Sequence, residues 1–179
     1  MRKIKWMLIA ILLVFIASAG EAKVYLDIYG KSFKRLTIAA PSFKGERTDG
    51  LKKDMNDLLN KDLDFSGFFI VAPPSLFDKE LSDEGVERKE VRFGNWRSIG
   101  VELLCKARLT EKEGRVVLDA FIYDTLDGSE MGHYRYTMSA ADQWRGVVHK
   151  LADAIILLVT GEKGIMGSRL LFVSGSSDE

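Results

Sequence analysis

The sequence has no excess of charge of either sign. Its 179 residues include 26 Lys and Arg and 26 Asp and Glu, so the formal net charge is zero. A basic excess would indicate a nucleic-acid partner and an acidic run would indicate a solvated tail, and neither pattern is present. With 46% hydrophobic residues, the chain can form one domain with a real core.

Cysteine is almost absent, since Cys105 is the single one. A disulfide framework and a metal site built from thiolates are therefore excluded. Cys105 also lies far from the N-terminus, so no cysteine is available there for lipid attachment. We expect Cys105 to be a small hydrophobic core residue.

Common catalytic motifs are absent as well. The sequence contains no HExxH, GxSxG or phosphate-loop spacing, and it has two histidines, His133 and His149. His149 and Asp153 are four residues apart, but an acid/base pair also needs a nucleophile or a metal within reach. We therefore favour a structural or interface hydrogen bond, and we predict no cofactor and no metal site. A small periplasmic hydrolase that uses this pair is kept as an alternative.

The N-terminus has the pattern of a secretory signal peptide. Three basic residues within the first five precede an unbroken apolar run (Trp6–Ile16) and a group of small residues up to Ala22. The apolar run is shorter than the roughly 20 residues of a membrane-spanning helix. We expect residues 1–22 to be removed on export, with cleavage after Ala19 or an uncleaved anchor as alternatives. An exported chain without disulfides fits a bacterial periplasm.

Strand and helix patterns alternate along the rest of the chain. Period-two patterns and bounding turn residues predict strands over 24–29, 36–40, 68–71, 101–109, 116–123, 131–138 and 169–173. Helical spacing predicts helices over 49–63 and from Trp144 to a stop at Gly161, with a short one at 96–99. Residues 76–93 show no regular pattern. The predicted fold is an α/β two-layer sandwich: a mixed sheet of about five strands with two main helices on one face.

The residue patterns also predict which faces are buried. In the strand over 101–109, the odd-numbered residues are apolar, whereas Glu102, Lys106 and Arg108 dominate the opposite face. In the last helix, Trp144 begins a broad apolar face, and the polar residues opposite it are Arg145, His149, Lys150 and Asp153.

Taken together, six segments in order resemble the N-terminal domain of the TolB family, which belongs to the periplasmic Tol-Pal system. The matching pieces are KVYLDIYG, RLTIAAPSF, DLLNKDLDFSGFFIV, NWRSIGVELLCKARL, VVLDAFIYDTLDGSEM and WRGVVHKLADAIILLVTGEKGIMGSRLLFVS. Three positions depart from the usual family residues, namely Ala40, Cys105 and Val148, and all three are changes of packing.

The resemblance implies a domain organisation. Residues 1–22 form a signal peptide, 23–168 form a TolB N-terminal-like α/β domain, and 169–179 form a final strand and the start of a linker. The family carries a C-terminal β-propeller after this point, and the chain is expected to be a fragment or truncated product without it.

The same resemblance implies a non-enzymatic adaptor that supports outer-membrane integrity and constriction at cell division. Its expected partner is the C-terminal domain of TolA, whereas Pal would bind only through the missing propeller, and the expected state is a monomer. The implied TolA-binding residues are the expected mature N-terminus: Lys23, Val24, Tyr25, Leu26, Asp27, Ile28 and Tyr29. An interdomain or structural role is expected for Trp144, Arg145, His149 and Asp153. A related exported α/β domain of the curli-assembly type is the alternative.

Overall fold

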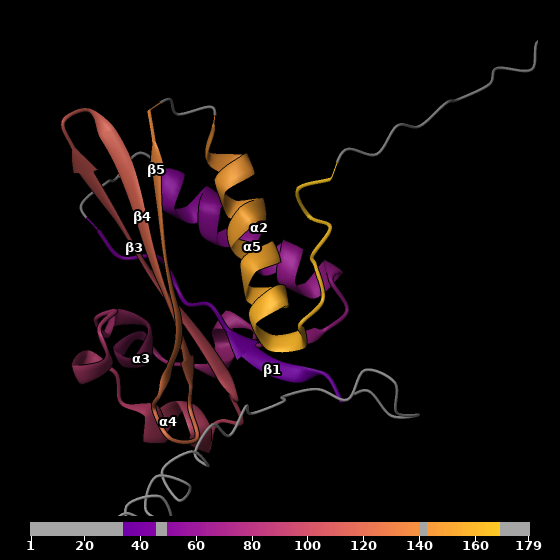
Figure 1. The fold of residues 1–179 in the computed structure, drawn as a ribbon. Coiled ribbons are helices and arrows are strands. Elements are labelled where there is room, and N and C mark those ends of the chain that lie inside the picture. Colours follow the sequence, from indigo (N-terminus) through magenta and orange to yellow (C-terminus); the bar gives the residue numbers. More distant parts are fainter. Residues whose placement is uncertain (1–33, 46–49, 140–142, 169–179) are drawn as a thin grey trace, which may run out of the picture.

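The computed structural model describes residues 34–45, 50–139 and 143–168 (Figure 1). The expected signal peptide, the expected strand over 24–29 and the expected strand over 169–173 lie outside these residues. The predictions that concern them are therefore neither supported nor contradicted by the fold.

Within the described residues, five strands form one mixed sheet, in the order β2-β1-β3-β4-β5. The strands are β1 (Leu36–Ala39), β2 (Phe69–Val71), β3 (Leu103–Lys112), β4 (Arg115–Asp124) and β5 (Glu130–Met138). β1 pairs in parallel with β2 and β3, and β3, β4 and β5 form an antiparallel meander. Parallel neighbours need a crossover connection, and α2 (Leu51–Phe65) provides it between β1 and β2.

The β3–β4 hairpin is tighter than the sequence pattern indicated. The strands were predicted over 101–109 and 116–123, but β3 continues to Lys112, β4 begins at Arg115, and the loop is only Glu113 and Gly114. Both loop residues have positive φ angles, 52° and 70°. A two-residue loop of this kind follows the right-handed twist of the strands, so pairing extends to the end of the hairpin.

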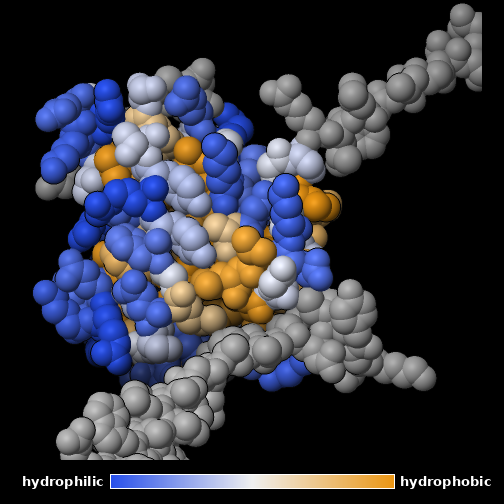
Figure 2. All heavy atoms as spheres, viewed as in Figure 1, coloured by the Kyte–Doolittle hydropathy of each residue, from blue (hydrophilic) through white to orange (hydrophobic). Residues whose placement is uncertain are grey.

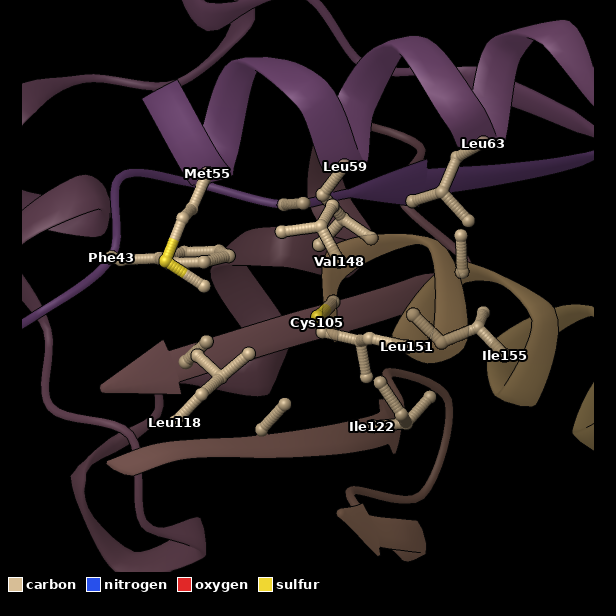
Figure 3. Close-up of a cluster of buried hydrophobic side chains, with 14 of the residues drawn as sticks. Phe43, Met55, Leu59, Leu63, Cys105, Leu118, Ile122, Val148, Leu151 and Ile155 are labelled. Atoms are coloured by element: carbon tan, nitrogen blue, oxygen red, sulfur yellow. The ribbon is translucent and has the colours of Figure 1, made fainter. Parts of the chain in front are cut away.

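Two long helices, α2 and α5 (Trp144–Thr160), cover one face of the sheet, as predicted (Figure 1). Figure 3 shows side chains of α2 (Met55, Leu59 and Leu63) and of α5 (Val148, Leu151 and Ile155) packed with those of the sheet. The other labelled side chains are Cys105 of β3, Leu118 and Ile122 of β4, and Phe43. Burial of each such aliphatic side chain contributes about 1.5–3 kcal/mol to folding. Cys105 is fully buried among them, which confirms it as a core residue. α5 ends at Gly161, as predicted, with a φ of 74°.

Short helices cover part of the opposite face of the sheet. They are η1 (Pro74–Leu76), α3 (Lys79–Asp83), η2 (Arg88–Glu90) and α4 (Phe93–Ser98), and Figure 1 shows α3 and α4 across the strands from α5. Their apolar side chains form a second cluster with residues of the sheet: Ala39, Ala72, Leu81, Val91, Trp96, Val101, Leu104 and Tyr123. The prediction of an irregular segment over 76–93 was therefore wrong, because helices of one or two turns are too short to show a period.

The second cluster corrects the predicted faces of β3 as well. Lys106 was expected on a polar face, but it is 1% exposed beneath α3 and α4. Val101 was expected to share a face with Cys105, yet it precedes β3 and packs with Leu104 on the other side. The short helices therefore cover part of the face of β3 that was expected to be polar, and this face is exposed to solvent only beyond them.

Candidate functional site

The residues expected to bind a partner, Lys23–Tyr29, lie outside the described residues, but the point where they join the domain is described. Lys34 Nζ lies 3.0 Å from Glu102 Oε1, and the Thr37 amide donates to Glu102 Oε2 at 3.0 Å. Tyr29 is five residues before Lys34 in the sequence. Glu102 thus holds the start of β1, and this start carries the expected binding segment.

β1 itself has no free edge. It lies between β2 and β3 and pairs with both. A partner strand cannot add to a strand whose two edges are already paired. If the N-terminal part of this chain binds a partner by strand addition, the pairing residues therefore precede β1.

His149 connects the two long helices. Its Nδ1 lies 2.7 Å from Oδ2 of Asp62 on α2, and both side chains are largely buried between the helices. Burial raises the pKa of the Asp62 carboxyl, although the hydrogen bond to His149 acts in the opposite direction. Sequence reasoning missed Asp62, because within α2 it reads as one more charged residue beside the apolar face.

Asp153 does not pair with His149. Its two carboxylate oxygens accept the backbone amides of Met166 at 2.8 Å and Gly167 at 3.1 Å. Gly164 passes so close that an added Cβ would lie 2.1 Å from Asp153 Oδ1. Asp153 therefore fixes the segment that follows α5 against the middle of this helix.

Trp144 and Arg145 lie at the start of α5. The Arg145 guanidinium sits 4.3 Å from the Trp144 ring centre, a cation–π contact at the surface. Trp144 also packs against the edge of the main core and is partly buried. The four residues singled out on α5 thus make three separate contacts, and the structure does not bring them together as one site.

This arrangement gives no support to hydrolytic chemistry at His149. The histidine is engaged by Asp62, and the carboxylate of Asp153 is occupied by two backbone amides. A cavity of about 790 Å³ lies instead at the start of α2, beside Phe43 and Lys52. Within the described ranges, no group of three or more His, Cys, Asp or Glu side chains is placed to hold a metal ion.

A buried ionic cluster holds the short helices to the sheet. Glu84 accepts hydrogen bonds from Trp96 Nε1 at 2.8 Å and from Arg92 Nε at 2.9 Å. Lys106 Nζ donates to the Leu81 carbonyl at 3.0 Å and lies 3.6 Å from Glu84 Oε2. Burial lowers the pKa of Lys106 to about 8, against the opposing attraction of Glu84.

None of the helices that the structure describes combines the length and the apolar character needed to cross a membrane.

Comparison with known proteins gives consistent matches. The family model described as "TolB amino-terminal domain" matches residues 24–131. "Tol-Pal system protein TolB" of Paramagnetospirillum magneticum is 30% identical over 88% of this chain and 35% of its own length. The protein of the same name from Geobacter sulfurreducens is 30% identical over 95% of this chain and 40% of its own length. The chain thus spans well under half the length of these relatives.

A solved structure agrees on the fold. The crystal structure of TolB from Acinetobacter baumannii superposes with a TM-score of 0.58 over 75% of this chain and 30% of that chain, at 16% identity. The family match and the named relatives favour the TolB interpretation of the sequence over the curli-assembly alternative. From these matches, the chain belongs to the TolB family and carries that family's amino-terminal domain.

Proposed function

We propose that this chain is a non-enzymatic adaptor of the periplasmic Tol-Pal system, and that its residues 23–29 bind the C-terminal domain of TolA. The observation that carries the proposal is the family match, which begins at residue 24 and so includes nearly all of this segment. In this assignment residues 1–22 are the signal peptide, 23–168 the adaptor domain, and 169–179 the final strand and linker.

The proposed mechanism is strand addition to an edge of the partner's sheet. In Val24–Tyr29, Val24, Leu26 and Ile28 share one side of an extended chain, and the other residues share the opposite side. The backbone of such a segment supplies hydrogen bonds to the partner's edge strand, and the alternate side chains supply specificity. The segment joins the domain at Lys34 and Glu102, so the folded domain acts as its anchor.

Two contacts hold elements of this anchor domain together. The Asp62–His149 hydrogen bond ties α2 to α5, and Asp153 holds the segment after α5. We assign Trp144, Arg145, His149 and Asp153 to this structural role, or to contact with the longer part that relatives carry. Binding of Pal, support of the outer membrane and constriction at cell division are proposed for the longer protein of which this domain is one part.

The test is the affinity for the purified C-terminal domain of TolA, measured by isothermal titration calorimetry. Deletion of residues 23–30 should abolish binding, because it removes the whole pairing segment, while the circular dichroism and the melting temperature stay unchanged. Deletion of residues 175–179 is the matched control at the other terminus and should leave the affinity unchanged. Equal affinity of the two deletions and the unaltered protein would refute the proposal.

A further inference from the structure

Within the described residues, the sheet leaves the outer edge of a long strand unpaired. β5 is nine residues long and lies at the end of the strand order, where β4 is its neighbour on one side. Its sequence contains neither proline nor lysine, two residues that commonly protect an edge from further pairing. Alternate residues of such a strand direct their amides and carbonyls away from the neighbour. β5 can therefore pair with one more extended chain.

Two tyrosines hold this edge against the last helix. The Tyr134 hydroxyl donates to the Ala154 carbonyl at 3.4 Å, and the Tyr136 hydroxyl donates to the Lys150 carbonyl at 3.5 Å. Both tyrosine rings also pack against the main core. Because the edge is already ordered, it loses little conformational entropy when it pairs with a partner.

The opposite face of the same strands is positively charged. Paired residues share a face of the sheet, and one row across β3, β4 and β5 consists of Arg108, Asp119 and Arg135. Lys112 and Arg115 pair on this face closer to the hairpin loop. We call the four cations the basic face. Figure 2 shows hydrophilic residues gathered on the left, on the side of the sheet that α2 and α5 do not cover.

Asp119 positions one of these arginines. Arg135 Nε donates to Asp119 Oδ1 at 2.6 Å, and Asp119 is only 4% exposed. The Arg135 side chain is itself 65% exposed, so its terminal nitrogens can donate to another acceptor. Arg108 forms no ion pair with any residue that the structure describes. A guanidinium held in one orientation suits a carboxylate, which it can bind through two parallel hydrogen bonds.

We propose that the outer edge of β5 and the basic face together bind an extended acidic segment of a partner protein. The backbone of this segment pairs with β5 between His133 and Thr137. Its alternate side chains lie on the side of the basic face, where a carboxylate contacts Arg135. The other three cations add attraction at longer range. This inference does not rest on the binding of TolA, because β5 is distant in sequence from residues 23–29.

An anionic lipid surface is the other partner that a basic face attracts, and two observations favour a polypeptide. Only a peptide backbone can pair with the alternate amides and carbonyls of β5. A membrane-binding surface also needs apolar side chains that enter the bilayer. The large apolar side chains that are exposed among the described residues belong to other parts of the chain: Phe65, Ile70, Leu76, Leu126, Leu157 and Ile165.

Fluorescence anisotropy tests the proposal with a labelled peptide of alternating threonine and glutamate, as long as β5. The purified exported chain should bind it at least tenfold more tightly than the same peptide with lysine or glutamine in place of glutamate. R135Q should weaken binding about tenfold, because it removes the direct contact with a carboxylate. K61Q is the matched control, since it removes one exposed charge from α2, and it should leave the affinity unchanged.

Two N-methylated forms of the peptide test the strand pairing. One is methylated at every threonine amide and the other at every glutamate amide, and one of the two should lose binding because its methyl groups face β5. The melting temperature reports whether R135Q is folded. D119N/R135Q replaces it if it unfolds, because this double variant leaves no buried carboxylate without its arginine.

Three results would overturn the proposal. The first is equal binding of the glutamate and lysine peptides, or an affinity that neither R135Q nor D119N/R135Q lowers. The second is equal binding of both methylated peptides and the unmethylated one, because the backbone would then play no part. The third is failure to bind the glutamate peptide, and binding to phosphatidylglycerol vesicles in that case would make a lipid surface the ligand.

Discussion

Replacement of Lys106 by methionine isolates the energetic effect of one buried charge. The lysine is 1% exposed, donates to the Leu81 carbonyl at 3.0 Å and lies 5.0 Å from the Trp96 ring centre. Its burial lowers the pKa from 10.5 to about 8. Methionine keeps the length and the apolar stem of the side chain but carries no charge at any pH.

The magnitude follows from the two pKa values. A pKa of about 8 in the folded protein and 10.5 in the unfolded chain means that folding disfavours the protonated amine by about 3 kcal/mol. Between these pH values the unfolded chain binds more protons than the folded one, so the free energy of unfolding rises with pH. From pH 7 to pH 9 the unaltered protein should gain about 1 kcal/mol relative to K106M.

The assay is urea unfolding at pH 7, 8 and 9, with the stability of each protein extrapolated to water. E84Q serves as the companion variant, because it leaves the buried ammonium without its anionic partner. We expect E84Q to lose about 3 kcal/mol at pH 7, and the double variant E84Q/K106M to recover part of that loss. The reasoning would be refuted if the stability of the unaltered protein minus that of K106M stayed constant or fell from pH 7 to pH 9.

Two further predictions concern the other buried carboxylates. The raised pKa of Asp62 means that this carboxyl contributes to folding stability at low pH and that the contribution is lost as pH rises. The stability of D62N relative to the unaltered protein should therefore be greater at pH 7 than at pH 4. Equal effects in thermal melts at both pH values would contradict this. The Asp119 carboxyl is desolvated, yet hydrogen bonds from Arg135 and His133 hold its pKa below the usual value, so its contribution is lost as pH falls. R135M should therefore weaken the fold at pH 7 and flatten its acid unfolding between pH 5 and pH 2, measured by circular dichroism; an acid transition as steep as that of the unaltered protein would argue against this pairing.

The elements with a long, clean period were predictable from the sequence. The meander follows from alternating residues in β3, β4 and β5, and the pairing of β4 with both neighbours confirms it. α5 follows from its apolar face and its stop at Gly161. On the face of the sheet that α2 and α5 cover, burial follows the position of a residue within its own element, and a local pattern records that directly.

Part of the candidate site was also visible in the sequence. His149 and Asp153 were singled out by their spacing and polarity, but their partners could not be read from it. Asp62 lies 87 residues before His149, and Met166 lies on a turn that has no periodic pattern. A contact between distant segments depends on how the helices pack, and one sequence does not record that packing.

The sequence by itself determined the class of the fold, the two helices that cover one face of the sheet, and the family. Only the tertiary structure decided that Lys106 is buried, that His149 binds Asp62, and that Asp153 holds the turn after α5. The physical reason is the range of each interaction. A period of two or 3.6 residues reports burial against the nearest layer, whereas the fate of a charged side chain depends on which distant segment closes over it.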